Sequence, residues 1–251
     1  MKDTERVGYA IMNTVHADVV GSLLRPAELL AAQKQLAAGT LNTAQFKEIE
    51  DRAVDAAIAL QENAGLNIVT DGEMRRQSFQ SQMTAAVSGF GELGLDAFLW
   101  GDWYDAQGVH RKPRPHRLGV VEKLSRRRYL SADEFSYLKK KTSRIPKVTI
   151  PSPTLWVNLW SPEYSGNAYP TLDAFLADIV GILRDEVTEL VRLGATYIQI
   201  DAPHYGLLLD VKTRVFYENA GWNLNQWLSL GIELDNAVVD GFRDVTFGFH
   251  V

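Results

Sequence analysis

The sequence predicts an α/β fold built on a parallel sheet, of the TIM (β/α)8 barrel type. Short apolar segments alternate with longer segments of helical periodicity along most of the 251 residues, and parallel strands need such helical crossovers. Polar residues recur directly after the apolar segments, as they do at the carboxyl ends of barrel strands. A doubly wound sheet would satisfy the same pattern. No G-x-G-x-x-G or P-loop motif follows the first apolar segment, which argues against the nucleotide-binding version of that sheet.

The first part of the chain contains two predicted strands and two predicted helices. We expect strands at 15–20 and 66–70 and helices at 27–38 and 48–64. Pro26 suits the first turn of a helix, and Thr43 is expected to cap the second one. Gly39 and Gly65 follow the two helical segments and are typical helix terminators.

Residues 75–147 interrupt the alternation, because they are rich in Gly, Arg and aromatic residues. We interpret them as a long insertion with a hairpin around 120–129 and a helix at 132–142. The pattern then resumes with strands at 147–150, 196–200 and 245–250 and helices at 172–193, 211–219 and 224–239. Thr171 is expected to cap the first of these helices. We therefore predict one partial barrel domain over 1–251, containing about the first five of eight β/α units.

Composition narrows the function classes. The chain has a formal net charge of −5 and is 46% hydrophobic, so neither nucleic acid nor an anionic membrane is an expected partner. No segment is long and apolar enough to span a bilayer, and the first residues lack the apolar core of a signal peptide. The cytoplasm is the expected location. The chain has no cysteine, which excludes disulfides and thiolate ligands within it.

Acidic side chains follow two of the predicted strands. Glu73 lies in an Asp-Gly-Glu turn after strand 66–70, and Asp201 directly follows an apolar Ile-Gln-Ile segment. Glu73 could belong to an ordinary surface turn, and Asp201 could cap the following helix. Alternatively, carboxylates in these places can accept hydrogen bonds from a substrate ammonium group.

Histidine and tryptophan side chains give further candidates. His250 ends the last strand and is a candidate metal ligand, although a lone histidine is more often structural. Trp156 and Trp160 follow strand 147–150, where an aromatic face could stack on a flat heterocycle or pack in the core. A cysteine-free metal site is one alternative, and its ligands would come from His16, His204, His250, Glu73 and Asp201.

Four strand-end segments carry a resemblance to a known family. They are Val20-Gly-Ser-Leu-Leu-Arg-Pro26, Val69-Thr-Asp-Gly-Glu-Met-Arg75, Ile198-Gln-Ile-Asp-Ala-Pro203 and Val245-Thr-Phe-Gly-Phe-His250. In this order they resemble the C-terminal catalytic domain of cobalamin-independent methionine synthase, and more closely the short, single-domain proteins of that superfamily. Each motif alone is weak, but four in order over nearly the whole chain are specific.

The resemblance implies a zinc-dependent methyltransferase on a TIM barrel. In such enzymes a Zn²⁺ held by His, Glu and two Cys binds homocysteine as its thiolate, which attacks the N5-methyl group of a methyltetrahydrofolate. By motif, Gly21 and Ser22 would line the amino-acid site, Glu73 and Asp201 would hold the ammonium group, Trp160 would lie against the pterin, and His250 would be the first zinc ligand.

The chain departs from the family pattern at the metal site. The family has a cysteine two residues after the histidine, which would fall just beyond Val251, and its other ligands belong to later strands. We therefore expect a truncated polypeptide that is inactive by itself and that could self-associate through the edge of its last strand. Two other functions stay open: zinc-dependent alkyl transfer to a thiol such as coenzyme M with epoxide opening, and non-catalytic ligand binding.

Overall fold

The computed structural model describes residues 17–77, 81–92, 103–104, 110–111, 118–219 and 223–251. Its main feature is a four-stranded parallel sheet with the order β1-β6-β7-β8. The strands are β1 (Ile68–Val69), β6 (Ile145–Pro151), β7 (Tyr197–Asp201) and β8 (Thr246–His250). The predicted α/β fold with a parallel sheet is therefore confirmed, while the eight-stranded barrel stays a prediction.

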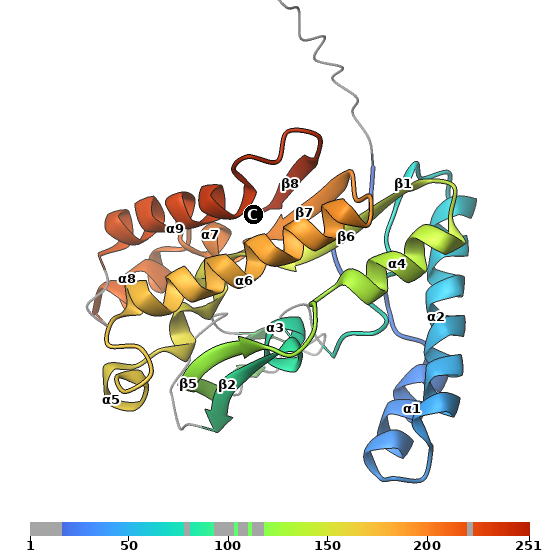
Figure 1. Cartoon of the computed structure of the whole chain (residues 1–251), viewed down its shortest axis with the longest axis horizontal. Coiled ribbons are helices and arrows are strands. Elements are labelled where there is room, and N and C mark those ends of the chain that lie inside the picture. Colours follow the sequence, from blue (N-terminus) through green and yellow to red (C-terminus); the bar gives the residue numbers. More distant parts are fainter. Residues whose placement is uncertain (1–16, 78–80, 93–102, 105–109, 112–117, 220–222) are drawn as a thin grey trace, which may run out of the picture.

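Helical crossovers connect the neighbouring strands of the sheet (Figure 1). After β6 come η1 (Pro153–Leu159), α5 (Pro162–Ser165) and α6 (Leu172–Arg192), and after β7 come α7 (His204–Leu207), α8 (Val211–Asn219) and α9 (Leu224–Val239). The Thr171 side chain accepts a hydrogen bond from the Ala174 N–H, as predicted for a helix cap. Along α6, Phe175, Ile179, Leu183 and Val187 recur every four residues and are fully buried. This stripe makes α6 the main apolar support of the sheet.

The N-terminal segment differs from the prediction in two respects. Asn42, and not Thr43, caps α2 (Thr43–Asn63), because Asn42 forms a reciprocal capping box with Gln45. Residues 17–20 are not a strand, since their polar groups bind side chains of the sheet rather than a neighbouring strand. The Val20 carbonyl accepts from Gln199 Nε2 at 2.7 Å, and Asp18 pairs with Lys147. The other predicted helix is present as α1 (Ala27–Ala37).

The described residues of 75–147, the segment predicted as an insertion, include a small antiparallel ladder and two helices. The helices are α3 (Ser81–Ala86) and α4 (Ala132–Lys141), and the ladder pairs β2 (Val87–Glu92) with β5 (Leu118–Arg126). The predicted hairpin at 120–129 is wrong, because this stretch mostly belongs to one continuous strand whose partner lies some thirty residues earlier in the chain. A two-residue pair, β3 (Trp103–Tyr104) with β4 (His110–Arg111), lies between them in sequence.

Two apolar clusters hold these elements together. The larger one joins the sheet, α6 and the β2–β5 ladder, and it includes Tyr169 and Ile198. The smaller one lies between α1, α2, β1 and α4 and is centred on Val54 and Leu138. No helix among the described residues is long and apolar enough to cross a membrane.

Candidate functional site

The carboxyl ends of the parallel strands bring the predicted residues to one edge of the sheet. β6, β7 and β8 are in register, so that Pro151 pairs with Asp201 and Asp201 with His250. The ladder continues one step further, because the Ser152 N–H donates to the Asp201 carbonyl and the Ala202 N–H to the His250 carbonyl. The Asp-Gly-Glu turn follows the end of β1 at the same edge.

An unusual backbone conformation positions Glu73. Glu73 is a non-glycine residue with φ of 55°, and the preceding Gly72 has φ of 69°. A Cβ on Gly72 would approach the Ala57 methyl group to 3.0 Å, so glycine is required there for space as well as for conformation. The left-handed conformation costs an ordinary residue about 1–2 kcal/mol, and it persists where surrounding contacts hold it. For Glu73 those contacts begin with Asp71, whose Oδ1 accepts the Glu73 N–H at 2.9 Å.

Both carboxylate oxygens of Glu73 are hydrogen-bonded. Oε1 accepts from Thr149 Oγ1 at 2.8 Å and from Arg76 Nη1 at 3.0 Å, while Oε2 accepts from Ser22 Oγ at 2.5 Å. Glu73 is buried, whereas Ser22 is exposed. Ser22 therefore links this buried carboxylate to the surface of the protein.

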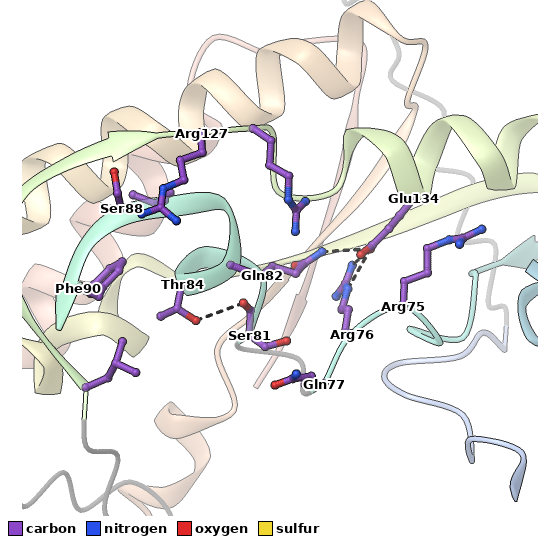
Figure 2. A pocket seen from close by; sticks show the side chains of 14 residues that line it. Arg75, Arg76, Gln77, Ser81, Gln82, Thr84, Ser88, Phe90, Arg127 and Glu134 are labelled. Carbon is purple, nitrogen blue, oxygen red and sulfur yellow. Dashed lines mark hydrogen bonds and ion pairs between the residues drawn. The ribbon is translucent and has the colours of Figure 1, made fainter. Parts of the chain in front are cut away.

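Arg76 is the central cation of this group. Besides Glu73, its guanidinium binds the Thr149 hydroxyl and carbonyl oxygens and forms an ion pair with Glu134 at 2.9 Å, as Figure 2 shows for Glu134. Burial acts to lower the pKa of Arg76, but the charges of Glu134 and Glu73 outweigh it and raise that pKa. Arg25 supports the turn by donating to the backbone carbonyls of Glu73 and Arg76.

Asp71 is a second buried carboxylate in the turn. Burial, followed by the nearby Glu134 charge, raises the pKa of Asp71 to about 6. Its Oδ2 atom is buried and has no hydrogen-bond partner among the described residues. Asp71 is therefore a group whose charge is poorly solvated in the folded chain.

A chain of side chains holds Asp201. Lys147 Nζ donates to Gln199 Oε1 at 2.7 Å, and Gln199 Nε2 donates to Asp201 Oδ1 at 2.6 Å. His250 Nδ1 lies 3.3 Å from the same Asp201 oxygen. Burial raises the pKa of Asp201, and the Glu73 charge contributes in the same direction. The two carboxylates predicted to act together are thus close enough to influence each other electrostatically.

His204 belongs to a different polar group. Its Nε2 lies 2.7 Å from Thr154 Oγ1, and burial lowers the pKa of His204 to about 4. Thr154 contacts Ser152, and Ser152 Oγ donates to Asp235 at 2.7 Å. His204 is therefore neutral at physiological pH and is engaged with hydroxyl groups.

Of the remaining predicted residues, Gly21 lies between Val20 and Ser22, which bind Gln199 and Glu73, and Trp160 directly follows η1. The Trp160 indole N–H donates to the Tyr169 carbonyl at 2.9 Å, and its ring packs against the larger apolar cluster. Gly21 is half-buried, and a Cβ there would meet no atom within 4 Å. Among the described residues no hydrogen bond or ion pair connects either of them to Glu73 or Asp201.

The described part of the chain does not form a metal centre by itself. No group of three or more His, Cys, Asp or Glu side chains converges there in a way that could hold a metal ion. His16, one ligand of the cysteine-free alternative, lies outside the described residues. The structure therefore gives the cysteine-free site no support within the part that it describes.

Sequence and structure comparisons identify relatives of this chain. Residues 15–239 match the family model described as cobalamin-independent synthase, catalytic domain. Methionine synthases of Pyrococcus abyssi and Thermococcus kodakarensis are 30% and 32% identical to the chain over 93% of its length. The chain spans about 60% of the length of these curated relatives.

Solved structures show the same fold. A putative vitamin-B12-independent methionine synthase from Listeria monocytogenes superposes with a TM-score of 0.69 at 20% identity, covering 94% of this chain and 65% of that one. A B12-independent methionine synthase from Shewanella, solved in complex with selenomethionine, gives a TM-score of 0.59 at 20% identity, with coverages of 84% and 54%.

Proposed function

Because the chain belongs to the family of cobalamin-independent synthase catalytic domains, we propose that these residues belong to a methyltransferase of the methionine synthase type that acts in methionine biosynthesis, on a TIM-type barrel. The methyl group would move from a methyltetrahydrofolate-like donor to the sulfur of homocysteine or a similar thiol. A carbon–sulfur bond forms and the carbon–nitrogen bond of the donor breaks. The thiol loses its proton, and the donor nitrogen gains one.

The pair of buried carboxylates is the observation that carries this proposal. Glu73 and Asp201 lie at the same sheet edge, and both are at most 4% exposed. The Glu73 charge raises the pKa of Asp201, so a cation between them would relieve an unfavourable interaction. The ammonium group of an amino-acid thiol supplies that cation, and the exposed Ser22 and neighbouring Gly21 would line its entry.

The same carboxylates discriminate between the candidate thiols. Coenzyme M carries a sulfonate instead of an ammonium group, and two buried carboxylates would repel it. The selenomethionine complex of the Shewanella relative concerns an amino acid of the proposed product class. Alkyl transfer to coenzyme M is therefore the less favoured reaction. We retain Trp160 as the proposed pterin contact, through the part of its ring that stays exposed.

Zinc is the cofactor that the family resemblance implies, and this chain does not accommodate it alone. The sequence has no cysteine, and among the predicted ligands only His250 is present, with its Nδ1 atom directed toward Asp201. We expect the 251 residues by themselves to bind zinc weakly, to lose this binding in His250→Ala, and to produce no methionine. Equilibrium dialysis with zinc and a product assay would check these points. Methionine formed by this chain would contradict them.

The absence of cysteine from these 251 residues favours a second candidate function, non-catalytic ligand binding. This alternative keeps the amino-acid site and predicts binding without turnover. Self-association through β8 and a cytoplasmic location stay predictions.

Replacing Asp201 with Asn tests the amino-acid site directly. Wild-type chain should bind L-homocysteine more tightly than 4-mercaptobutanoate, which lacks the amino group. Loss of a charge-assisted hydrogen bond of about 1.5–3 kcal/mol should weaken homocysteine binding about 10- to 100-fold and leave 4-mercaptobutanoate nearly unaffected. Isothermal titration calorimetry measures both affinities.

Asp235→Asn is the matched control, because Asp235 is also buried and hydrogen-bonded but contacts Ser152 and Tyr205 instead. It should leave homocysteine binding unchanged. Equal affinities of Asp201→Asn and wild type for homocysteine would refute the assignment.

A further inference from the structure

A cavity lies beside the strand-end site, between α3, the β2–β5 ladder and the start of α4. Its volume is about 500 Å³, within the range of small-molecule pockets. Figure 2 shows side chains from these segments around it. Neither the family resemblance nor the proposed methyl transfer assigns a role to this cavity.

The lining of the cavity is strongly basic. Among the described residues it includes four arginines and one carboxylate, Glu134. Arg75 is neutralised by Glu50 and Asp51, and in Figure 2 its guanidinium points away from Glu134. Arg76 is neutralised by Glu73 and Glu134.

Arg127 and Arg128 form no ion pair with a carboxylate among the described residues, although the charge of Arg128 reaches the buried Glu186 and acts to lower its pKa. Among the described residues, the hydrogen bonds of the Arg128 guanidinium go to the backbone carbonyls of Tyr129 and Leu130, at 3.0 and 3.3 Å. The Arg127 guanidinium has no hydrogen bond or ion pair with the part of the chain that the structure describes, and both arginines are exposed. Two adjacent exposed guanidinium groups that lack a carboxylate ion pair among the described residues offer a site for a carboxylate or phosphate.

The inner part of the cavity offers a hydrogen-bond acceptor. Gln82 is 3% exposed, and its Nε2 donates to Ser131 Oγ at 2.7 Å and to Glu134 at 3.1 Å. These contacts fix the amide orientation, so that Oε1 is the atom left buried and without a partner among the described residues. An unsatisfied buried acceptor favours a ligand that carries an N–H or O–H donor. Phe90 adds an aromatic surface to the lining.

We propose that this pocket binds a small organic anion. Its carboxylate or phosphate group contacts Arg127 and Arg128, an N–H or O–H group donates to Gln82 Oε1, and an apolar ring packs against Phe90. Arg76 connects the pocket to Glu73, so the two sites share one cation. Anion binding in this pocket is separate from the proposed methyl transfer and can be measured without turnover. A chain that fails to transfer methyl groups could therefore still bind the anion.

Two probe pairs test the site by calorimetry in low salt. Hippurate carries a ring, an amide N–H and a carboxylate, and benzoylglycinamide is its neutral analogue; phenyl phosphate and phenol form the second pair. At least one anion should bind about tenfold more tightly than its neutral analogue, and raising the salt to physiological strength should weaken it several-fold. The tighter of the two anions identifies the preferred group. Binding of neither anion, or equal binding of an anion and its analogue, would overturn the proposal.

Arginine variants locate the binding site. Arg127→Gln and Arg128→Gln should each weaken anion binding about five- to tenfold, and the double variant should abolish the preference over the neutral analogue. Lys123→Gln is the charge-matched control, because Lys123 lies on β5, just before the two arginines, but interacts with Asp178 and Tyr169 outside the pocket. Equal losses in Lys123→Gln and Arg127→Gln would show a non-specific charge effect and would exclude this pocket. The arginines are exposed, so the fold should tolerate all three replacements.

Discussion

Replacing Arg76 with Gln is expected to lower the free energy of unfolding by about 3–5 kcal/mol, the usual effect of removing one partner from a buried ion pair. Arg76 is 3% exposed and binds Glu73, Glu134 and Thr149. Without it, Glu73 and Glu134 keep their negative charges near the buried Asp71 carboxylate and lose their common counter-ion. Chemical denaturation at pH 7 measures the change.

Arg75→Gln provides a control from the same dipeptide. Arg75 also forms two ion pairs, with Glu50 and Asp51, but these lie nearer the surface, so its loss should cost only about 1 kcal/mol. The Arg76→Gln penalty should also shrink as the pH falls below about 6, because the buried Asp71 carboxylate, whose charge Arg76 stabilises, then takes up a proton. Similar losses in both variants, or a penalty that does not change with pH, would show that Arg76 acts through packing alone.

Asp71 and His204 should give the stability of the chain two opposing pH dependences. The folded-state pKa of Asp71 is about 6 against an ordinary value of 3.8, so the folded chain holds this proton more tightly and loses stability as the pH rises from about 4 to 6. The folded-state pKa of His204 is about 4 against 6.5, so protonation of the unfolded chain lowers stability as the pH falls from about 6.5 to 4. Each effect corresponds to about 3 kcal/mol.

Difference curves between variants and wild type separate the two groups. Asp71→Asn should be nearly neutral at pH 4 and up to about 3 kcal/mol stabilising at pH 7, because asparagine resembles the protonated acid. His204→Gln should gain a similar amount relative to wild type as the pH falls from 6.5 to 4. Urea denaturation at several pH values measures both curves. A flat curve for either variant would show that the corresponding group titrates normally in the folded chain.

The sequence was most informative where local signals and burial agree. The apolar stripe of α6, its Thr171 cap and the strand ends at Asp201 and His250 are all local patterns, and the structure confirms them. The segment 15–20 has the composition of a strand. However, the Val20 carbonyl accepts a hydrogen bond from the Gln199 side chain of β7 and not from the backbone of a neighbouring strand. Hydrophobic pattern alone does not reveal such a competitor.

The charged centre of the site was harder to predict. Arg76 and Lys147 look like surface charges in the sequence, but their partners lie up to 129 residues away, as in the Lys147–Asp18 pair. One local signal existed for Lys147, which directly precedes the apolar residues Val148 and Ile150 of a strand that is buried from Lys147 to Pro151. For Arg76 the only hint was its position directly after the Asp-Gly-Glu-Met-Arg motif.

The Gln199 amide has a consequence for how a ligand would meet Asp201. Lys147 holds its oxygen, while its nitrogen donates to both the Val20 carbonyl and Asp201. An amide flip would place two donors, Lys147 and the amide nitrogen, face to face, so the amide has a single orientation and Asp201 is fixed with it. The conformational entropy of aligning this carboxylate is therefore lost during folding and not during association. A cation arriving at Asp201 would find its acceptor already preorganised.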